Sequence, residues 1–221
     1  GHNFQTVYDG VTYNFVNTQS VVPTRDNQVF SYPTVEIIQG QYVTDTFVFD
    51  NQIKNPKFVL SNGRVDKSKL EISINSNGII SKYSLSTDVS TITSSTRVFY
   101  AQENEDGFIE VYFGDGVLGK DLKDGDVIDA TYITVDATHA DGAKQFTMAD
   151  NINGFSQATM ITLSNASGGA EKESIDSIKF KATKFYTSQN RLVTLNDYKA
   201  KVSEYYPNAD AVAVWGGEDN D

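Results

Sequence analysis

The sequence contains no cysteine, so it has neither a disulfide framework nor a thiolate zinc site, and packing or partners must stabilise it. Its two histidines are His2 and His139. Nucleophilic catalysis needs a base held beside the nucleophile, and the sequence has no Gly-x-Ser-x-Gly motif. A glycosidase pair of carboxylates stays open, because nothing singles out two of the 29 acidic residues. The sequence therefore indicates no enzyme, no catalytic residues, no metal site and no cofactor.

Long apolar runs and clustered positive charge are also missing. No run of about eighteen apolar residues predicts a spanning helix, and the N-terminus lacks the basic and apolar regions of a signal peptide. The 18 Lys and Arg residues are scattered, and the net charge is -11. Nucleic-acid binding needs a clustered positive surface. The composition therefore favours a soluble protein whose partners include neither nucleic acid nor membrane.

Short apolar and β-branched segments recur between clusters of Gly, Asn, Asp and Ser, which is typical of antiparallel strands. Leu70, Ile72 and Ile74 alternate with polar residues, so this strand has one buried and one wet face. Three dipeptides favour hairpin turns: Asn62-Gly63, Asn77-Gly78 and Asp106-Gly107. The predicted strands are Thr34–Ile38, Gln41–Phe49, Lys57–Leu60, Lys69–Ile74, Thr96–Ala101, Phe108–Phe113 and Val127–Val135.

The segment after residue 170 predicts two helices. In the first, apolar residues recur at spacings of three or four, which is typical of an amphipathic helix packed on one side: Ile175, Ile178, Ala182 and Phe185.

The second predicted helix begins at Thr194, and Asp197 approximates a capping box with it. Pro207 and Asn208 end this helix. Its apolar stripe consists of Leu195, Tyr198, Val202 and Tyr205.

These patterns predict an α+β fold that is β-rich, with mostly antiparallel strands and two amphipathic helices near the C-terminus. Because the last strand, Asp210–Trp215, has nothing after it to cover it, we expect a fragment of a longer protein. The fold makes one or two domains. We expect residues 1–2 to be left from a tag and residues 3–135 to form a β-rich region. Residues 136–165 form a long loop, which contains a short strand near Ala158–Leu163. Residues 166–221 hold the helical pair and the final strand.

Three sequence features could suggest binding sites. Gly114-Asp115-Gly116 with Gly119 lacks both the dinucleotide spacing and a Gly-Lys-Ser ending, so a hairpin turn with a glycine bulge is favoured. Gly168-Gly169 is either a hinge or, as we favour, a flexible start that needs unusual backbone angles.

Acidic residues gather at Glu103–Asp106 and at Asp121, Asp124 and Asp126. A calcium loop would need acids where Gln102 and Phe113 stand. We therefore expect solvated loop carboxylates.

Four segments carry a resemblance to a known family: VYFGDGVLGKDLKDGDVIDATY, SGGAEKESIDSIKFKA, RLVTLNDYKAKV and YPNADAVAVW. They resemble the baseplate J-like proteins of contractile-tail bacteriophages, nearest to the wedge proteins of the T-even type. The segments cover roughly the C-terminal half, and the first hundred residues match only in β-rich character. The resemblance makes a group of residues fold signatures and not catalytic groups: Phe113, Gly114, Asp115, Gly116, Gly119, Gly168, Gly169, Thr194, Asp197 and Tyr198.

The resemblance implies a structural component of the tail baseplate of the virion, assembled in the host cytoplasm. Such a component builds wedges, links them into a ring around the hub and rearranges on contraction. Its partners would be other wedge and hub proteins and a second copy of itself, as a homodimer. Residues 136–165 are a candidate docking segment, because long loops often carry contacts with partners. No periodic apolar stripe runs through His139–Lys144, so we expect a deletion there to leave the chain folded. The candidate interface residues are His139, Lys144, Tyr205 and Tyr206.

Two alternatives stay open. One is a receptor- or carbohydrate-binding β-domain of a tail fibre or adhesin, which the predicted helices disfavour. The other is the same component in a bacterial contractile injection system.

Because no metal-ligand spacing is present, we expect a chelator to leave the melting temperature of the purified chain unchanged. Thermal unfolding with and without EDTA, followed by circular dichroism, measures this. A fall of several degrees that added zinc or calcium reverses would contradict the expectation.

Overall fold

The structure is a computed structural model, and it describes residues 2–54, 56–136, 139–152, 159–188, 191–206 and 211–216. Within the helices, the side chains at positions 180, 184, 185, 187, 188, 203 and 204 lie outside this description. The chain divides into two units, Gly1–Ala170 and Glu171–Asp221, and each is considered by itself.

A four-stranded sheet in the first unit has the order β13-β1-β2-β5. Asp9 and Gly10 join β1 to β2 with φ of 48° and 78°, the backbone that a two-residue hairpin turn requires. Phe15 is buried, and its ring meets that of Phe146 edge-on at 4.9 Å between centroids. The strands are β1 (Asn3–Tyr8), β2 (Val11–Asn17), β5 (Ile37–Gln39) and β13 (Thr147–Met148).

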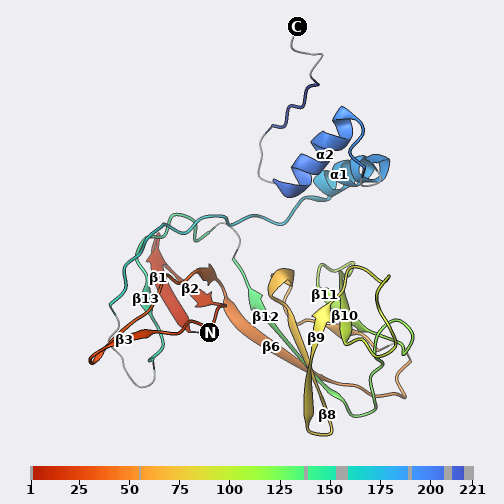
Figure 1. Cartoon of the computed structure of the whole chain (residues 1–221), viewed down its shortest axis with the longest axis horizontal. Coiled ribbons are helices and arrows are strands. Elements are labelled where there is room, and N and C mark those ends of the chain that lie inside the picture. The colour runs from red at the N-terminus through yellow and green to blue at the C-terminus, as the bar shows by residue number, and fades with distance from the viewer. Residues whose placement is uncertain are drawn as a thin grey trace. The chain divides into compact units, whose positions relative to one another are not determined.

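A seven-stranded sheet has the order β6-β12-β8-β9-β10-β11-β7 (Figure 1). All its neighbouring pairs are antiparallel except β9 and β10. Its strands are β6 (Gln41–Val48), β7 (Phe58–Val59), β8 (Glu71–Ser76), β9 (Ile79–Leu85), β10 (Val98–Glu103), β11 (Ile109–Phe113) and β12 (Val127–Thr134). A short 3-10 helix, η1 (Lys67–Lys69), precedes β8, and β3 (Thr24–Asp26) pairs with β4 (Val29–Ser31) apart from both sheets.

One face of the seven-stranded sheet forms the main hydrophobic core. Alternate residues of the central strands point into it, as the period of two of a strand requires. The buried members are Phe58, Leu60, Leu70, Ile72, Ile74, Tyr83, Phe99, Ile109, Val111, Ile128, Ala130 and Tyr132. Val43, Phe47 and Phe49 of the β6 segment pack against this cluster.

A polar network links the core to three parts of this sheet. The hydroxyl of the buried Tyr132 in β12 donates a hydrogen bond of 2.8 Å to Asp45 in β6. The backbone N–H and the hydroxyl of Ser61 also donate to Asp45, at 2.7 and 2.8 Å. Burial raises the pKa of the Tyr132 hydroxyl, which therefore stays a donor. Because a buried hydroxyl without a partner costs about 1 to 3 kcal/mol, this network fixes how β6, β12 and the β7–β8 loop meet.

The predicted strands of the β-rich region are confirmed, with boundaries shifted by a few residues. The Asn77-Gly78 hairpin is also confirmed, with φ of 51° and 86° between β8 and β9. Asp106-Gly107 joins β10 to β11 as predicted. Asn62-Gly63 does not make a hairpin, because the strands on either side of it, β7 and β8, are not neighbours in the sheet.

Most of the strand pairs that the sequence did not predict belong to the four-stranded sheet, which contains the N-terminal strands β1 and β2. Strands β1 and β2 mix polar and apolar residues without strict alternation, so their pattern is weak. In the long loop, the strand is β13 at Thr147–Met148, which pairs with β1. The strand predicted near Ala158–Leu163 is wrong for residues 159–163, and Ala158 lies outside the described residues.

Residues 139–150 pack against the N-terminal sheet. Ala140 and Ala143 are 3% and 1% exposed, and the N–H of Ala166 donates to the carbonyl of Ala143 at 2.9 Å. Beyond β13, Ala149 N–H donates to Asn3 O. The burial of Ala140 and Ala143 counts against the expectation that residues around His139–Lys144 can be deleted without unfolding the chain. Small residues that pack closely leave no periodic apolar stripe in the sequence.

The second unit contains α1 (Ile175–Ser188) and α2 (Leu195–Tyr205), as predicted. The predicted capping box is present: Thr194 accepts from Asp197 N–H, and Asp197 accepts from Thr194 N–H at 2.8 Å. The bonds that the Asp197 carboxylate accepts from the N–H groups of Thr194 and Val193 lower the pKa of this carboxyl, the bond from Thr194 most.

The predicted burial of the first helix on one side is wrong for the residues that can be assessed. Ile175 and Ile178 are 69% and 48% exposed, because two helices of 14 and 11 residues bury only the strip between them. The side chain of Phe185 and the whole of Pro207 and Asn208 lie outside the described residues.

The final strand is also wrong for residues 211–216, which form no strand. The predicted fold class is confirmed, since antiparallel strands dominate and the two helices lie near the C-terminus. The proposed division into regions stays a prediction. None of the described helices is long and apolar enough to cross a membrane.

Ile72→Ala should destabilise the chain by about 2 to 5 kcal/mol, because the Ile72 side chain is 1% exposed within the core. Ile79→Ala is the matched control, since Ile79 is 70% exposed one strand away and should cost less than about 0.5 kcal/mol. Urea unfolding measures both. Similar losses for the two variants would contradict the assigned face of β8.

Candidate functional site

The loop Gly114–Gly119, which follows β11, closes on itself. The N–H of Gly116 donates to the carbonyl of Gly119 at 3.1 Å. A Cβ added to Gly114 would lie 2.6 Å from the Cα of Gly119, a separation that real Cβ atoms do not adopt. The two glycines are therefore needed because the two ends of the loop touch.

Asp115 organises the tip of this loop. Its Oδ1 accepts the N–H groups of Leu118 at 2.9 Å and Val117 at 3.0 Å, and these bonds lower the pKa of the carboxyl. The expected hairpin turn is wrong, because β11 and β12 are not neighbours in the sheet. The aspartate acts within the loop, as a side chain that mimics a turn.

The tip of this closed loop carries two exposed apolar residues, Val117 and Leu118, which are 70% and 45% exposed. Tyr100 supports the tip from β10 by donating from its hydroxyl to the carbonyl of Leu118 at 3.4 Å. Apolar side chains held on an ordered loop lose little conformational entropy on binding. This tip is a candidate contact that the sequence did not single out, since a valine and a leucine carry no signal by themselves.

A second group of exposed apolar residues lies at the β8–β9 hairpin, at the bottom of Figure 1. Ile79 and Ile80 are 70% and 69% exposed. Cross-strand pairing places Ile80 in one row with Asn75, Val127 and Val48 on the same face of the sheet. Val48 is 64% exposed. Every residue of this row except Asn75 is apolar.

The predicted interface residues belong to two different units of the chain. His139 and Lys144 are exposed in the first unit, and the Nδ1 of His139 lies 2.7 Å from the carbonyl of Asp136. Tyr205 and Tyr206 are 70% and 69% exposed in the second unit. Their participation in an interface stays a prediction.

The remaining motif residues have local structural roles. Gly168 has φ of 93° with open space around it, and Gly169 N–H donates to Asp141 at 3.2 Å. The positive φ supports the interpretation that this pair needs unusual backbone angles, and the hinge stays untested. Tyr198 follows the Thr194 cap in α2 and is 44% exposed.

The expectation that the acidic residues after the loop are solvated holds for only some of them. Asp121 and Asp124 are exposed, but Asp126 is 6% exposed and accepts the N–H of Lys123 at 2.9 Å. It therefore closes the turn before β12. Among the residues that the structure describes, no group of three or more His, Cys, Asp or Glu side chains could hold a metal ion.

Residues 41–139, which hold β6 to β12, match the family described as bacteriophage baseplate wedge protein gp6, third domain.

Among curated proteins, the chain is similar to baseplate wedge protein gp6 of Enterobacteria phage T4, with 25% identity over 216 residues. The similarity covers 88% of this chain and 32% of that protein, so the chain spans about a third of its relative's length. The chain is thus a T4-type baseplate wedge relative, and the resemblance seen in the sequence is confirmed. The family match begins at residue 41, which corrects the expectation that the first hundred residues match only in β-rich character.

Gly114→Ala should destabilise the chain by roughly 1 to 3 kcal/mol, because the new methyl group would push the backbone at Gly119 away. Gly63→Ala is the matched control: its Cβ would meet other atoms only at 3.7 Å or more, so its effect should stay within about 0.5 kcal/mol. Thermal unfolding of the two variants tests this. A Gly114→Ala protein as stable as the Gly63→Ala protein would show that the two ends of the loop do not touch.

Proposed function

We propose that this chain is an assembly module of a contractile phage tail baseplate, in which it contributes to a wedge. The observation that carries the proposal is the match of residues 41–139 to the third domain of a baseplate wedge protein, together with the similarity to the phage T4 wedge protein. The module acts by binding geometry and has no catalytic role. Its location is the tail baseplate of the virion.

Two features of the structure support an assembly role. Ordered elements of the first unit hold apolar side chains in solvent, at Val117, Leu118, Ile79 and Ile80. The helices of the second unit do the same with Ile175, Tyr205 and Tyr206. Exposed apolar side chains on ordered elements are typical of surfaces that partners cover.

The finer parts of the proposal follow the same logic. The chain links neighbouring wedges into a ring around the hub and takes part in the rearrangement on contraction. Its partners are other wedge and hub proteins and a second copy of itself. The net charge of -11 disfavours nucleic acid as a partner.

The first unit has a solvent-open hollow of about 560 Å³, which gives no support to the carbohydrate-binding alternative. Ligand sites are usually lined by apolar and aromatic side chains, and this hollow is lined by two serines, an arginine, a lysine and an aspartate.

Gold-labelled antibodies against the purified chain should mark the baseplate end of the tail in contractile-tailed particles encoded by the same genome. Electron microscopy of negatively stained particles, with pre-immune serum as the control, tests this. Label along the fibres or at their tips, with none at the baseplate, would favour the receptor-binding alternative and overturn the proposal.

The isolated chain should also self-associate, because the proposed ring needs at least one contact between copies and two-fold dimers are the commonest solution. Light scattering over a concentration series should give about twice 24.4 kDa at high concentration. A strict monomer throughout the series would count against self-association by this part of the protein, and leave the baseplate location to the labelling experiment.

A further inference from the structure

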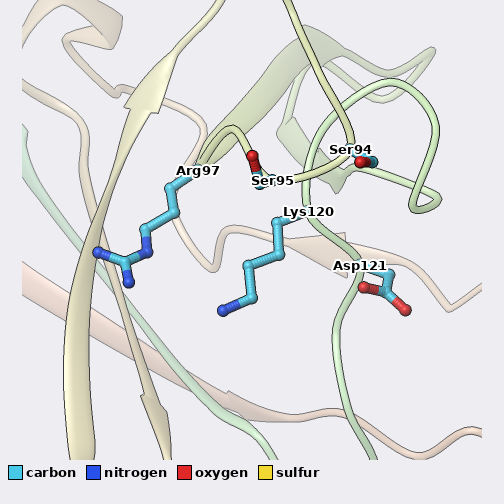
Figure 2. A pocket seen from close by; sticks show the side chains of 5 residues that line it. All are labelled: Ser94, Ser95, Arg97, Lys120 and Asp121. Carbon is cyan, nitrogen blue, oxygen red and sulfur yellow. The ribbon is translucent and has the colours of Figure 1, made fainter.

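A hollow of about 560 Å³ lies between the segment that leads into β10 and the segment that follows the Gly114–Gly119 loop (Figure 2). Ser94, Ser95 and Arg97 line it from the first segment, and Lys120 and Asp121 line it from the second. It is open to solvent, so it admits a protruding side chain more readily than it encloses a small molecule.

One backbone hydrogen bond joins the two sides of the hollow, and two further bonds order the segment before β10. The N–H of Lys120 donates to the carbonyl of Thr96 at 2.8 Å, and the N–H of Val98 donates to the same carbonyl at 3.1 Å. The N–H of Thr93 donates to the hydroxyl of Thr96 at 2.9 Å, which closes the turn that carries Ser94 and Ser95. Arg97 and Lys120 therefore start from neighbouring, fixed backbone positions.

Two of the three charged side chains that line the hollow, Arg97 and Lys120, are positive. In Figure 2, the Arg97 and Lys120 side chains extend in the same direction, whereas the Asp121 carboxylate points away from them. Neither cation forms an ion pair among the residues that the structure describes. Two positive charges that line one hollow make the electrostatic potential there more positive, so an anion bound in the hollow lowers the electrostatic energy.

We propose that Arg97 and Lys120 form a binding site for the carboxylates of an acidic segment on a partner protein. The guanidinium presents parallel N–H donors that match a carboxylate, and the ammonium supplies a second positive charge.

The charge of the rest of the chain decides the class of partner. A chain with a net charge of -11 repels an extended polyanion such as nucleic acid, which carries many phosphates. One or two carboxylates on a short protein segment interact with the two cations alone and avoid most of this repulsion. The site thus gives the acidic module one locally positive contact.

A peptide titration of the 221-residue chain tests the site directly. The probe is acetyl-tetraglutamate amide, the comparison is acetyl-tetraglutamine amide, and the readout is the ¹H–¹⁵N NMR spectrum, including the Arg97 side-chain Nε–H. We expect saturable shifts at Ser94, Ser95, Arg97 and Lys120 with the glutamate peptide only. The affinity should fall several-fold between about 20 and 200 mM salt, because exposed charges are screened.

The variant Arg97→Gln/Lys120→Gln should weaken binding roughly tenfold or more, since it removes both charged donors. Lys67→Gln/Lys69→Gln is the matched control, because it removes the same charge from η1, away from the hollow, and should bind almost as the wild type does. Arg97→Lys keeps the positive charge but lacks the planar guanidinium, so its affinity should lie between those of the double variant and the control. Unchanged melting temperatures check that all variants are folded.

Three outcomes would overturn the proposal: equal shifts with the glutamine peptide, equal weakening by the control variant, or shifts with inorganic phosphate but none with the glutamate peptide. The site is a property of the β-rich unit alone. A failed titration therefore leaves the baseplate proposal intact, and baseplate labelling decides nothing about the hollow.

Discussion

The pairing of β12 with β6 and β8 is the interaction on which the rest of the larger sheet depends. Strand β12 pairs with β6 along eight residues and with β8 along five, and it supplies Ile128, Ala130 and Tyr132 to the core. Its partner β6 comes more than 80 residues earlier in the chain, so the sheet forms only when distant segments meet. The hydrogen bonds of Tyr132 and Ser61 to Asp45 fix this meeting to one register.

The loop segments around this sheet inherit their positions from it. The closed Gly114–Gly119 loop lies between β11 and β12, and the segment after it is tied to Thr96 by the N–H of Lys120. The same packing that needs glycine at 114 and 119 therefore places Val117 and Leu118 in solvent and Lys120 beside Arg97. The need for glycine at positions 114 and 119 and the placement of Lys120 in the hollow therefore share one cause, which is the close contact between the two ends of the loop.

The helical unit follows a different principle. Its capping box is local and depends on Thr194 and Asp197 alone, whereas its apolar residues are only partly covered by the two helices. A pair of short helices has too little surface to bury a full stripe on each.

The sequence by itself determined where most strands of the larger sheet lie, the Asn77-Gly78 turn and the capping box, because strand alternation, turn backbone angles and caps depend on neighbours a few residues away. The motifs also carried the family resemblance. Only the tertiary structure decided the strand order, the burial of Ala140, Ala143 and Asp126, and the placement of Arg97 and Lys120 around one hollow. These features join segments far apart in the chain, and no local period records which distant backbone a residue will touch.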